Sequence, residues 1–141
     1  AAGVYSWLLT VTGAAQLAVD FIENLDVSVW VVLLAINIFL LLVGAVLDTA
    51  SAILVLTPLL AQIATSLGVD LIHFGIIVVM NLSIGTFTPP FGLNIFVGQA
   101  VFKVPLSSLY PGLVPFILIS IGVLMAVTYL PGLSLWILQF I

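Results

Sequence analysis

The sequence predicts an all-α integral membrane protein, and three observations lead to this fold class. Hydrophobic residues make up 65% of the 141 residues, charged residues make up 4%, and the mean hydropathy is +1.52. Soluble domains carry about 25% charged residues, so this composition is typical of a chain surrounded by lipid. Apolar runs of helical length recur along the chain, and two shorter runs flank a Thr-Pro-Pro segment. The length allows about five membrane passes with no soluble domain between them.

Charge and cysteine content exclude several functions. The sequence holds one Lys or Arg and five Asp or Glu, a net charge of -4, which gives no electrostatic support for nucleic-acid binding. It holds no Cys, so disulfides and thiolate metal sites are excluded. Lys103 alone does not orient the chain by the positive-inside rule. Because the sequence shows neither an initiator Met nor a signal-peptide pattern and opens on an apolar run, we expect a piece of a longer protein.

Residues 1–27 are expected to contain the end of a membrane helix followed by an interfacial helix. The apolar run over residues 1–11 is followed by a glycine. Over residues 14–23, Leu17 and Phe21 fall on one helical face, whereas the polar side chains fall elsewhere. This pattern is typical of a short amphipathic helix that lies in the headgroup region, with its acidic residues in water.

Residues 28–67 are expected to form two apolar helices joined by a polar connection with almost no loop. Ser28 is a suitable N-cap for the first helix, and Pro58 should bend the second. Two interpretations stay open: two full membrane helices with the connection at the water interface, or a re-entrant hairpin whose tip stops inside the membrane. Both helices are apolar all round, so helical periodicity does not separate these interpretations. Good starting residues for the second helix are Asp48, Thr49 and Ser51.

Residues 71–104 are expected to form one membrane helix that is broken near its middle. The apolar runs 71–84 and 93–104 are each shorter than the roughly 20 residues that span a bilayer, but together they are long enough. Between them, two prolines remove helical hydrogen bonds and should free the carbonyls of Gly85 and Thr86, while two glycines allow the backbone to unwind. The prolines and glycines are Pro89, Pro90, Gly85 and Gly92.

This break is a candidate ion and substrate site. The first half-helix ends in carbonyls that carry about half a negative charge, and the second begins with amides that carry about half a positive charge. A cation and a carboxylate therefore each find a favourable helix end, as in carriers with discontinuous helices. The alternative is a simple proline kink, which a single proline would favour. Oxygen ligands that suit sodium are offered by Thr86, Thr88, Asn94 and the carbonyl of Gly85, partly through the backbone.

Polar residues stand at the start of the broken helix, and one further helix follows it. Gly68 is a plausible C-terminal stop for the preceding helix, and Asp70 is a plausible N-cap for the broken helix. His73, one turn after Asp70, is expected at the interface, bonded to Asp70 or to headgroups. A metal site would need more His or carboxylate ligands than this stretch offers. Residues 105–141 are expected to begin with a connection, after which Pro111 opens a membrane helix over residues 112–129. A short interfacial tail should follow.

Three segments of the sequence resemble the large membrane subunit of TRAP transporters, the tripartite ATP-independent periplasmic carriers. They read LDTASAILVLTPLL, GVDLIHFGIIVVMNLSIGTFTPPFGLNIFV and YLPGLSLW, in the order and spacing of that family. The resemblance covers essentially the whole chain and corresponds to the C-terminal half of such a subunit, whose full length holds two inverted repeats. It implies an elevator-type transporter in which residues 28–67 form a re-entrant hairpin and residues 71–104 form the discontinuous helix of one repeat.

The resemblance also implies a function, partners and a location. It implies sodium symport of organic acids of the C4-dicarboxylate or sialic-acid type, with sodium as coupling ion and no other cofactor. A periplasmic substrate-binding protein would deliver the substrate, and a small four-helix membrane subunit would support the scaffold in the bacterial inner membrane. Carried over by motif, the hairpin tip and the break would line the ion and substrate site with Asp48, Thr49, Ser51, Gly85, Thr86, Thr88, Pro89, Pro90, Gly92 and Asn94.

Two other classes of protein remain open on the residues alone. Acidic residues in membrane segments are functional candidates by default, so Asp48 and Asp70 are a candidate carboxylate pair of an intramembrane aspartyl hydrolase. The pair would have to meet across facing helices, whereas Asp70 has the position of a helix cap. A purely structural membrane module is the other alternative, and the double-proline break argues against it.

Overall fold

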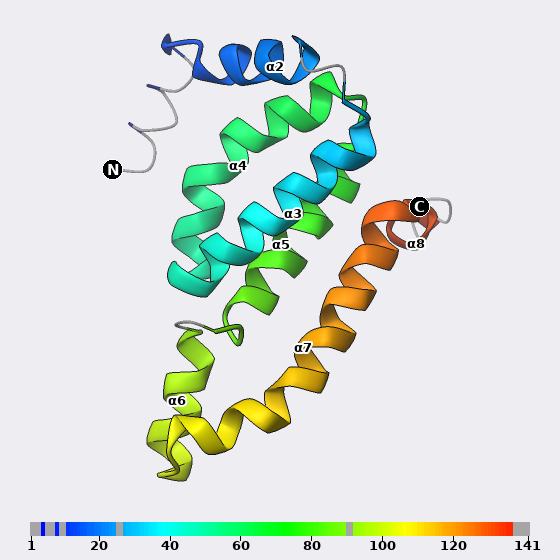
Figure 1. The fold of residues 1–141 in the computed structure, drawn as a ribbon. Coiled ribbons are helices and arrows are strands. Elements are labelled where there is room, and N and C mark those ends of the chain that lie inside the picture. The colour runs from blue at the N-terminus through cyan, green and yellow to red at the C-terminus, as the bar shows by residue number, and fades with distance from the viewer. Residues whose placement is uncertain (1–3, 5–7, 9–10, 25–26, 90–91, 137–141) are drawn as a thin grey trace.

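The computed structural model describes residues 4, 8, 11–24, 27–89 and 92–136. Within these residues every regular element is helical (Figure 1), which confirms the predicted all-α class. The helix expected over residues 1–11 lies mostly outside the described residues, as does the last part of the expected tail, residues 137–141. The helices in chain order are α2 Ala14–Asn24, α3 Val29–Val46, α4 Thr49–Ser66, α5 Leu71–Gly85, α6 Leu93–Phe102, α7 Leu106–Tyr129 and α8 Gly132–Leu135.

In the described part of the chain, three helices are long and apolar enough to cross a membrane, namely α3, α4 and α7. The helix α5 has 15 residues and α6 has 10, so each is shorter than the roughly 20 residues that a span requires. The interruption predicted between the two apolar runs is therefore confirmed as a gap between α5 and α6.

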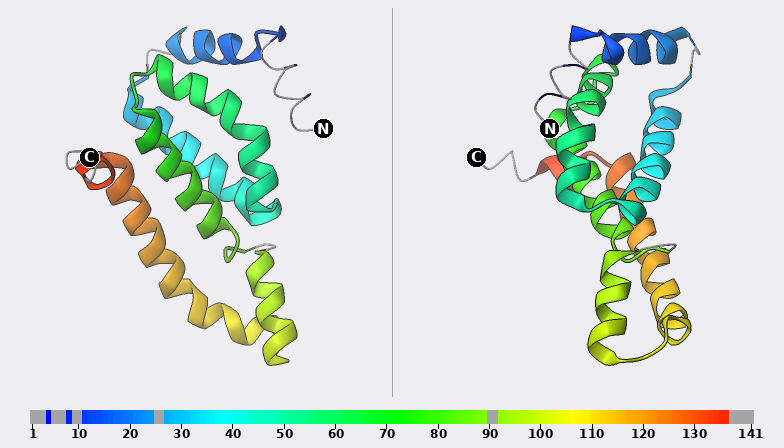
Figure 2. Two further views of the ribbon diagram at one scale, coloured as in Figure 1. Left: turned by 180° about the vertical axis from the view of Figure 1, so that it is seen from behind. Right: turned by 90° about the vertical axis from the view of Figure 1, so that its left-hand side faces the viewer.

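The helices α3 and α4 are connected by a tight turn, and α5 packs against both of them. Only Leu47 and Asp48 separate the end of α3 from the start of α4. The two arms diverge from their shared turn (Figure 2), and α5 contacts each arm more extensively than the arms contact each other. The core of this unit is apolar, and its fully buried members include Leu40, Ala52, Phe74 and Leu82.

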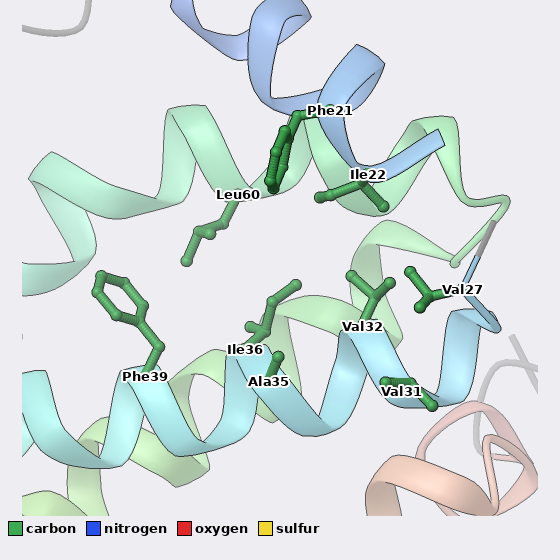
Figure 3. Close-up of a pocket in the computed structure, with 9 residues that line it drawn as sticks. All are labelled: Phe21, Ile22, Val27, Val31, Val32, Ala35, Ile36, Phe39 and Leu60. Carbon is green, nitrogen blue, oxygen red and sulfur yellow. The ribbon is translucent and has the colours of Figure 1, made fainter. Parts of the chain in front are cut away.

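The amphipathic helix predicted over residues 14–23 is confirmed as α2, which lies across the open end of the two arms (Figures 1 and 2). Val19 of α2 is buried, whereas Leu17 and Phe21 are 68% and 65% exposed. An apolar cavity of about 430 Å³ lies between α2, α3 and α4. Phe21 of α2 and Leu60 of α4 lie side by side on one side of this cavity, and Ile36 and Phe39 of α3 line the opposite side (Figure 3). Placement of α2 in the headgroup region stays a prediction.

The glycine stop after α4 and the aspartate cap before α5 are both confirmed. Gly68 has a φ of 73°, and the amides of Gly68 and Val69 donate to carbonyls of the last turn of α4, which forms a Schellman motif. The Asp70 carboxylate then caps α5, because Oδ1 accepts from the backbone N–H groups of Ile72 at 2.8 Å and His73 at 3.1 Å.

One expectation about helix starts was met in position only, and another was wrong. Ser28 is the N-cap residue of α3, as expected, but its side chain makes no capping hydrogen bond. The last long helix begins at Leu106 rather than after Pro111, which lies inside α7 together with Pro115. Prolines are tolerated in membrane helices because neighbouring groups satisfy the carbonyls that they leave unpaired. The helix bends in its N-terminal half instead of ending there (Figure 1).

The expectation for His73 was also wrong. The residue is 4% exposed, and its ring lies 2.5 Å from Ser134 Oγ and 3.3 Å from the carbonyl oxygen of Thr128. Asp70 bonds the backbone N–H of His73 and not its ring. The end of α7 and the short helix α8 fold over the first turn of α5, so the imidazole finds partners there rather than at the surface.

Candidate functional site

A tight turn follows the last residues of α5. The backbone N–H of Phe87 donates to the carbonyl of Ile84 at 3.2 Å, and that of Thr88 donates to the carbonyl of Gly85 at 3.0 Å. Each bond reaches back three residues, as in a 3₁₀ turn, rather than four as in an α-helix. The α-helical bonding therefore ends at Thr86, whose backbone N–H still donates to the carbonyl of Leu82 at 3.3 Å.

Gly92 restarts the helix on the far side of the break. Its φ of 40° lies in the left-handed region, and it occupies the N-cap of α6. Pro89 is exposed in the turn, whereas Pro90 lies outside the described residues. The prediction that a glycine after the prolines supplies backbone freedom is therefore confirmed at Gly92.

Asn94 joins the two half-helices. Its backbone N–H donates to the carbonyl of Thr86 at 2.9 Å, and its Nδ2 donates to Thr86 Oγ1 at 2.9 Å. The carbonyl of Gly85 accepts from Thr88, so both oxygens that were expected to be freed carry a backbone amide partner. A carbonyl oxygen has two lone pairs, so each keeps one for a further donor or a cation.

The two threonine hydroxyls of the break use their protons on α5. Thr86 Oγ1 donates to the carbonyl of Ser83 at 2.7 Å, and Thr88 Oγ1 donates to the carbonyl of Ile84 at 2.7 Å. A hydroxyl that has given its proton away presents lone pairs on its other side. The break thereby offers neutral hydroxyl, carbonyl and amide oxygens, a donor set that fits a hard cation such as sodium.

The end of α3 packs directly on the break. A Cβ on Gly85 would lie 2.4 Å from the carbonyl carbon of Gly44, so the two glycine backbones touch. Beside them, the backbone N–H of Gly92 donates to the carbonyl of Ala45 at 3.1 Å. Sequence reasoning missed Gly44 and Ala45; the available signal was a pair of small residues in an otherwise bulky apolar run, a pattern typical of close helix packing in membranes.

The turn between α3 and α4 lies beside this break (Figures 1 and 2). Asp48 caps α4 by accepting from the backbone N–H of Ser51 at 2.9 Å, and its carboxylate is exposed. This backbone bond, and then the Ser51 side chain, lower the pKa of the Asp48 carboxyl. Among the described residues, no hydrogen bond joins the side chains of Asp48, Thr49 or Ser51 to the break. Their part in the site stays a prediction.

The positions of Asp48 and Asp70 rule out the interpretation as an aspartyl hydrolase. Asp48 caps the start of α4, and Asp70 caps the start of α5, just beyond the other end of α4. The 18 residues of α4 separate them by about 27 Å along the helix axis. Carboxylates at that distance cannot act on one substrate bond as a pair. Each side chain instead has a helix-capping role.

The chain is similar to known transporter proteins. The family model described as "Tripartite ATP-independent periplasmic transporter, DctM component" matches residues 1–133. The C4-dicarboxylate TRAP transporter large permease protein DctM of Pseudomonas aeruginosa is 40% identical over 132 residues, which is 94% of this chain and 31% of that protein.

Two further relatives carry other substrate names. The sialic acid TRAP transporter large permease protein SiaM of Vibrio cholerae is 31% identical over 132 residues, again 94% of this chain and 31% of the relative. The isethionate TRAP transporter permease protein DctMQ of Oleidesulfovibrio alaskensis is 41% identical over 105 residues, which is 74% of this chain and 16% of the relative. The chain therefore spans 31% or less of the length of these three relatives.

Proposed function

Because the chain belongs to the DctM family of tripartite ATP-independent periplasmic transporters, we propose that it forms part of the large permease subunit of a sodium-coupled carrier of organic acids. The observation that carries this proposal is the break between α5 and α6, which the end of α3 covers through Gly44 and Ala45. The relatives are named for C4-dicarboxylate, sialic acid and isethionate, all of which are organic acids.

In this proposal, sodium binds to the oxygens at the break. Thr86, Thr88 and Asn94 supply hydroxyl and amide oxygens, and the carbonyl of Gly85 supplies a backbone ligand. The C-terminal end of α5 adds about half a negative charge beside them. The exposed carboxylate of Asp48 adds a full negative charge at the neighbouring turn, where its lowered pKa keeps it ionised at neutral pH.

The substrate carboxylate is proposed to lie on the side of the break where α6 begins. The helix dipole there favours an anion. However, the amides of Gly92 and Asn94 already donate to the carbonyls of Ala45 and Thr86. The α6 end therefore contributes mainly its partial charge, and we propose that the rest of the carrier supplies further donors to the substrate.

We propose that coupling rests on the contact between the end of α3 and the break. A cation that draws the oxygens of the break together favours one packing of Gly44 against Gly85, and that packing closes the turn over the substrate. We propose that this unit then moves as one body against a scaffold, in an elevator-type transition. A ligand drives such a transition only through the difference between its affinities for the two states.

The proposal includes partners and a location. A periplasmic substrate-binding protein would deliver the organic acid, and a small four-helix membrane subunit would support the scaffold. The carrier would be a multi-pass protein of the bacterial inner membrane, surrounded by the lipid bilayer that the apolar helices α3, α4 and α7 require.

The test of this function is uptake by the complete carrier, reconstituted with its small membrane subunit and its binding protein in proteoliposomes. Uptake of a labelled C4-dicarboxylate or sialic acid should require an inward sodium gradient and should stop when potassium replaces sodium. This chain reconstituted alone should transport nothing, because we expect the rest of the full-length carrier to complete the site. Equal uptake with potassium, or sodium-driven flux by this chain alone, would contradict the proposal.

Asp48 offers a separate test with a matched control. In the full carrier, Asp48→Asn should raise the sodium concentration for half-maximal uptake several-fold, because the charge is lost while asparagine still caps α4. Asp70→Asn removes the same charge from a capping residue at the far end of α4 and should leave the sodium curve unchanged. Equal curves for both variants and the parent would make Asp48 a capping residue only.

The pH dependence of the Asp48 cap has a defined sign. Its folded pKa is lowered by the Ser51 bonds, so its contribution to stability is present above the unfolded pKa and is lost as pH falls through the lowered value. The ordinary pKa of Asp is about 3.9, so acidification from pH 8 to pH 5 should leave this cap intact.

A further inference from the structure

A buried chain of polar side chains connects three helices away from the break. Asn81 Nδ2 on α5 donates to Asn37 Oδ1 on α3 at 2.6 Å, and Asn37 Nδ2 donates to Thr128 Oγ1 on α7 at 3.1 Å. Thr128 Oγ1 in turn donates to the carbonyl of Leu124 at 2.8 Å. Asn37, Asn81 and Thr128, which we call the polar clamp, are each 0% exposed.

The end of α7 is attached at two further points close to the polar clamp. The carbonyl of Thr128 lies within hydrogen-bond distance of His73 Nε2 on α5, and Ser134 of α8 bonds the other ring nitrogen. The Tyr129 hydroxyl donates to the carbonyl of Trp30 on α3 at 3.3 Å, and the two rings lie 5.5 Å apart. Side-chain hydrogen bonds thus connect this end of α7 to both α3 and α5.

Apolar burial contributes little to the attachment of α7. Among its residues only Leu124 and Thr128 are buried. Its other half lies beside α6 (Figure 1), where Phe116 contacts Phe87 of the break at a ring separation of 5.2 Å. The helix α7 therefore contacts both halves of the broken helix, with its polar attachment concentrated at the α5 side.

The polar clamp lies on the same helix seam as the contact at the break. Asn81 precedes Gly85 by one helical turn on α5, and Asn37 precedes Gly44 by two turns on α3. A helix is stiff over such distances, so the hydrogen bond between the asparagines limits how far α3 can slide along α5. The same restriction sets the contact of Gly44 with Gly85 and the bond from Gly92 to the Ala45 carbonyl.

The polar clamp is incompletely satisfied, which points to a role other than stability. Asn81 Oδ1 is buried and has no hydrogen-bond partner among the described residues. Apolar side chains at these positions would avoid burying an unpaired acceptor. Buried polar pairs that are retained at a cost in stability are best known for fixing the register of packed helices.

We propose that Asn37, Asn81 and Thr128 are positioning residues that hold α3, α5 and α7 in one register and thereby set the geometry of the helix break. Thr128 extends this restriction to α7, so the hairpin arm α3, the half-helix α5 and α7 move as one unit. The effect on ion binding rests on the function proposed above, whereas the register itself does not.

The test uses three threonine variants in the full carrier. Thr128→Val removes the hydroxyl with almost no change of shape, and Thr128→Ser keeps it. Thr65→Val is the matched control, because among the described residues the Thr65 hydroxyl bonds only the carbonyl of Ala61, in its own helix. Thr128→Val should raise the sodium concentration for half-maximal uptake about threefold to twentyfold, the range expected from one interhelical hydrogen bond in a membrane protein. Thr128→Ser and Thr65→Val should behave like the parent.

A distance measurement tests the register independently of transport. Spin labels on cysteines placed at Leu42 of α3 and Val123 of α7, both exposed in this chain, should report one narrow distance in the parent and in Thr128→Ser. The distribution should broaden in Thr128→Val and in Asn37→Leu. If the parent shows no sodium-dependent uptake, the proposed function fails. The distances alone then decide whether the polar clamp fixes the register of the helices. The inference would be overturned if Thr128→Val and Asn37→Leu both kept the parental distances. It would also be overturned if Thr128→Val lowered only the amount of folded protein and left the sodium curve unchanged.

Discussion

Gly85→Ala is expected to abolish transport by the full carrier and to lower its stability by about 3 kcal/mol or more, at or beyond the upper end of overpacking costs. The added Cβ would lie 2.4 Å from the carbonyl carbon and 2.6 Å from the Cα of Gly44, and 2.8 Å from the amide nitrogen of Ala45. All three contacts are with backbone, which cannot rotate away as a side chain can. The end of α3 must therefore move off α5, and the bond from Gly92 to Ala45 is lost with it.

Two other glycines provide graded controls for this substitution. Gly44→Ala should cost less, because its Cβ would meet backbone atoms of Leu82 and Gly85 at 3.0 to 3.3 Å. Gly75→Ala, on the same helix as Gly85, meets nothing within 4 Å and should be neutral or slightly stabilising. The measurements are thermal unfolding of the purified carrier and the initial rate of uptake. Parental stability and uptake for Gly85→Ala would show that α3 does not pack on the break.

The parts of the fold that the sequence predicted are those with local causes. Composition decides the membrane class, because charged residues in lipid are costly. The gap between α5 and α6 follows from prolines and glycines next to each other in the chain. The cap at Asp70 and the glycine stop at Gly68 also depend only on neighbouring residues, and both were predicted.

The errors and omissions have long-range causes. Pro111 was expected to begin a helix, but it lies within α7, since contacts with other helices decide whether a proline ends a membrane helix or bends it. His73 was expected at the surface, and partners from residues far along the chain bury it. No local signal pairs Asn37 with Asn81, or Gly44 with Gly85, because each pair depends on how α3 crosses α5.

The α3–α4 turn and the helix break are expected to lose access to water together when the carrier binds its ligands. The sequence has no Cys, so single cysteines can be placed in this part of the carrier once any others are removed. Thr49 and Thr88 are half-buried on the two sides of the proposed site, and Ser107 is exposed in the first turn of α7. If the turn closes over bound sodium and substrate, water and water-soluble reagents are excluded from both threonine positions but not from Ser107.

The direct test is the rate at which a membrane-impermeant thiol reagent labels Thr49→Cys, Thr88→Cys and Ser107→Cys in the complete carrier. Sodium plus substrate should slow labelling at Thr49 and Thr88 at least about tenfold. This corresponds to ligand binding that favours the closed state over the open state by about 1.4 kcal/mol. Labelling at Ser107 should not change. An unchanged rate at Thr49, with and without sodium and substrate, would contradict a hairpin tip that closes over the site and would make the segment around Asp48 an ordinary turn at the membrane surface.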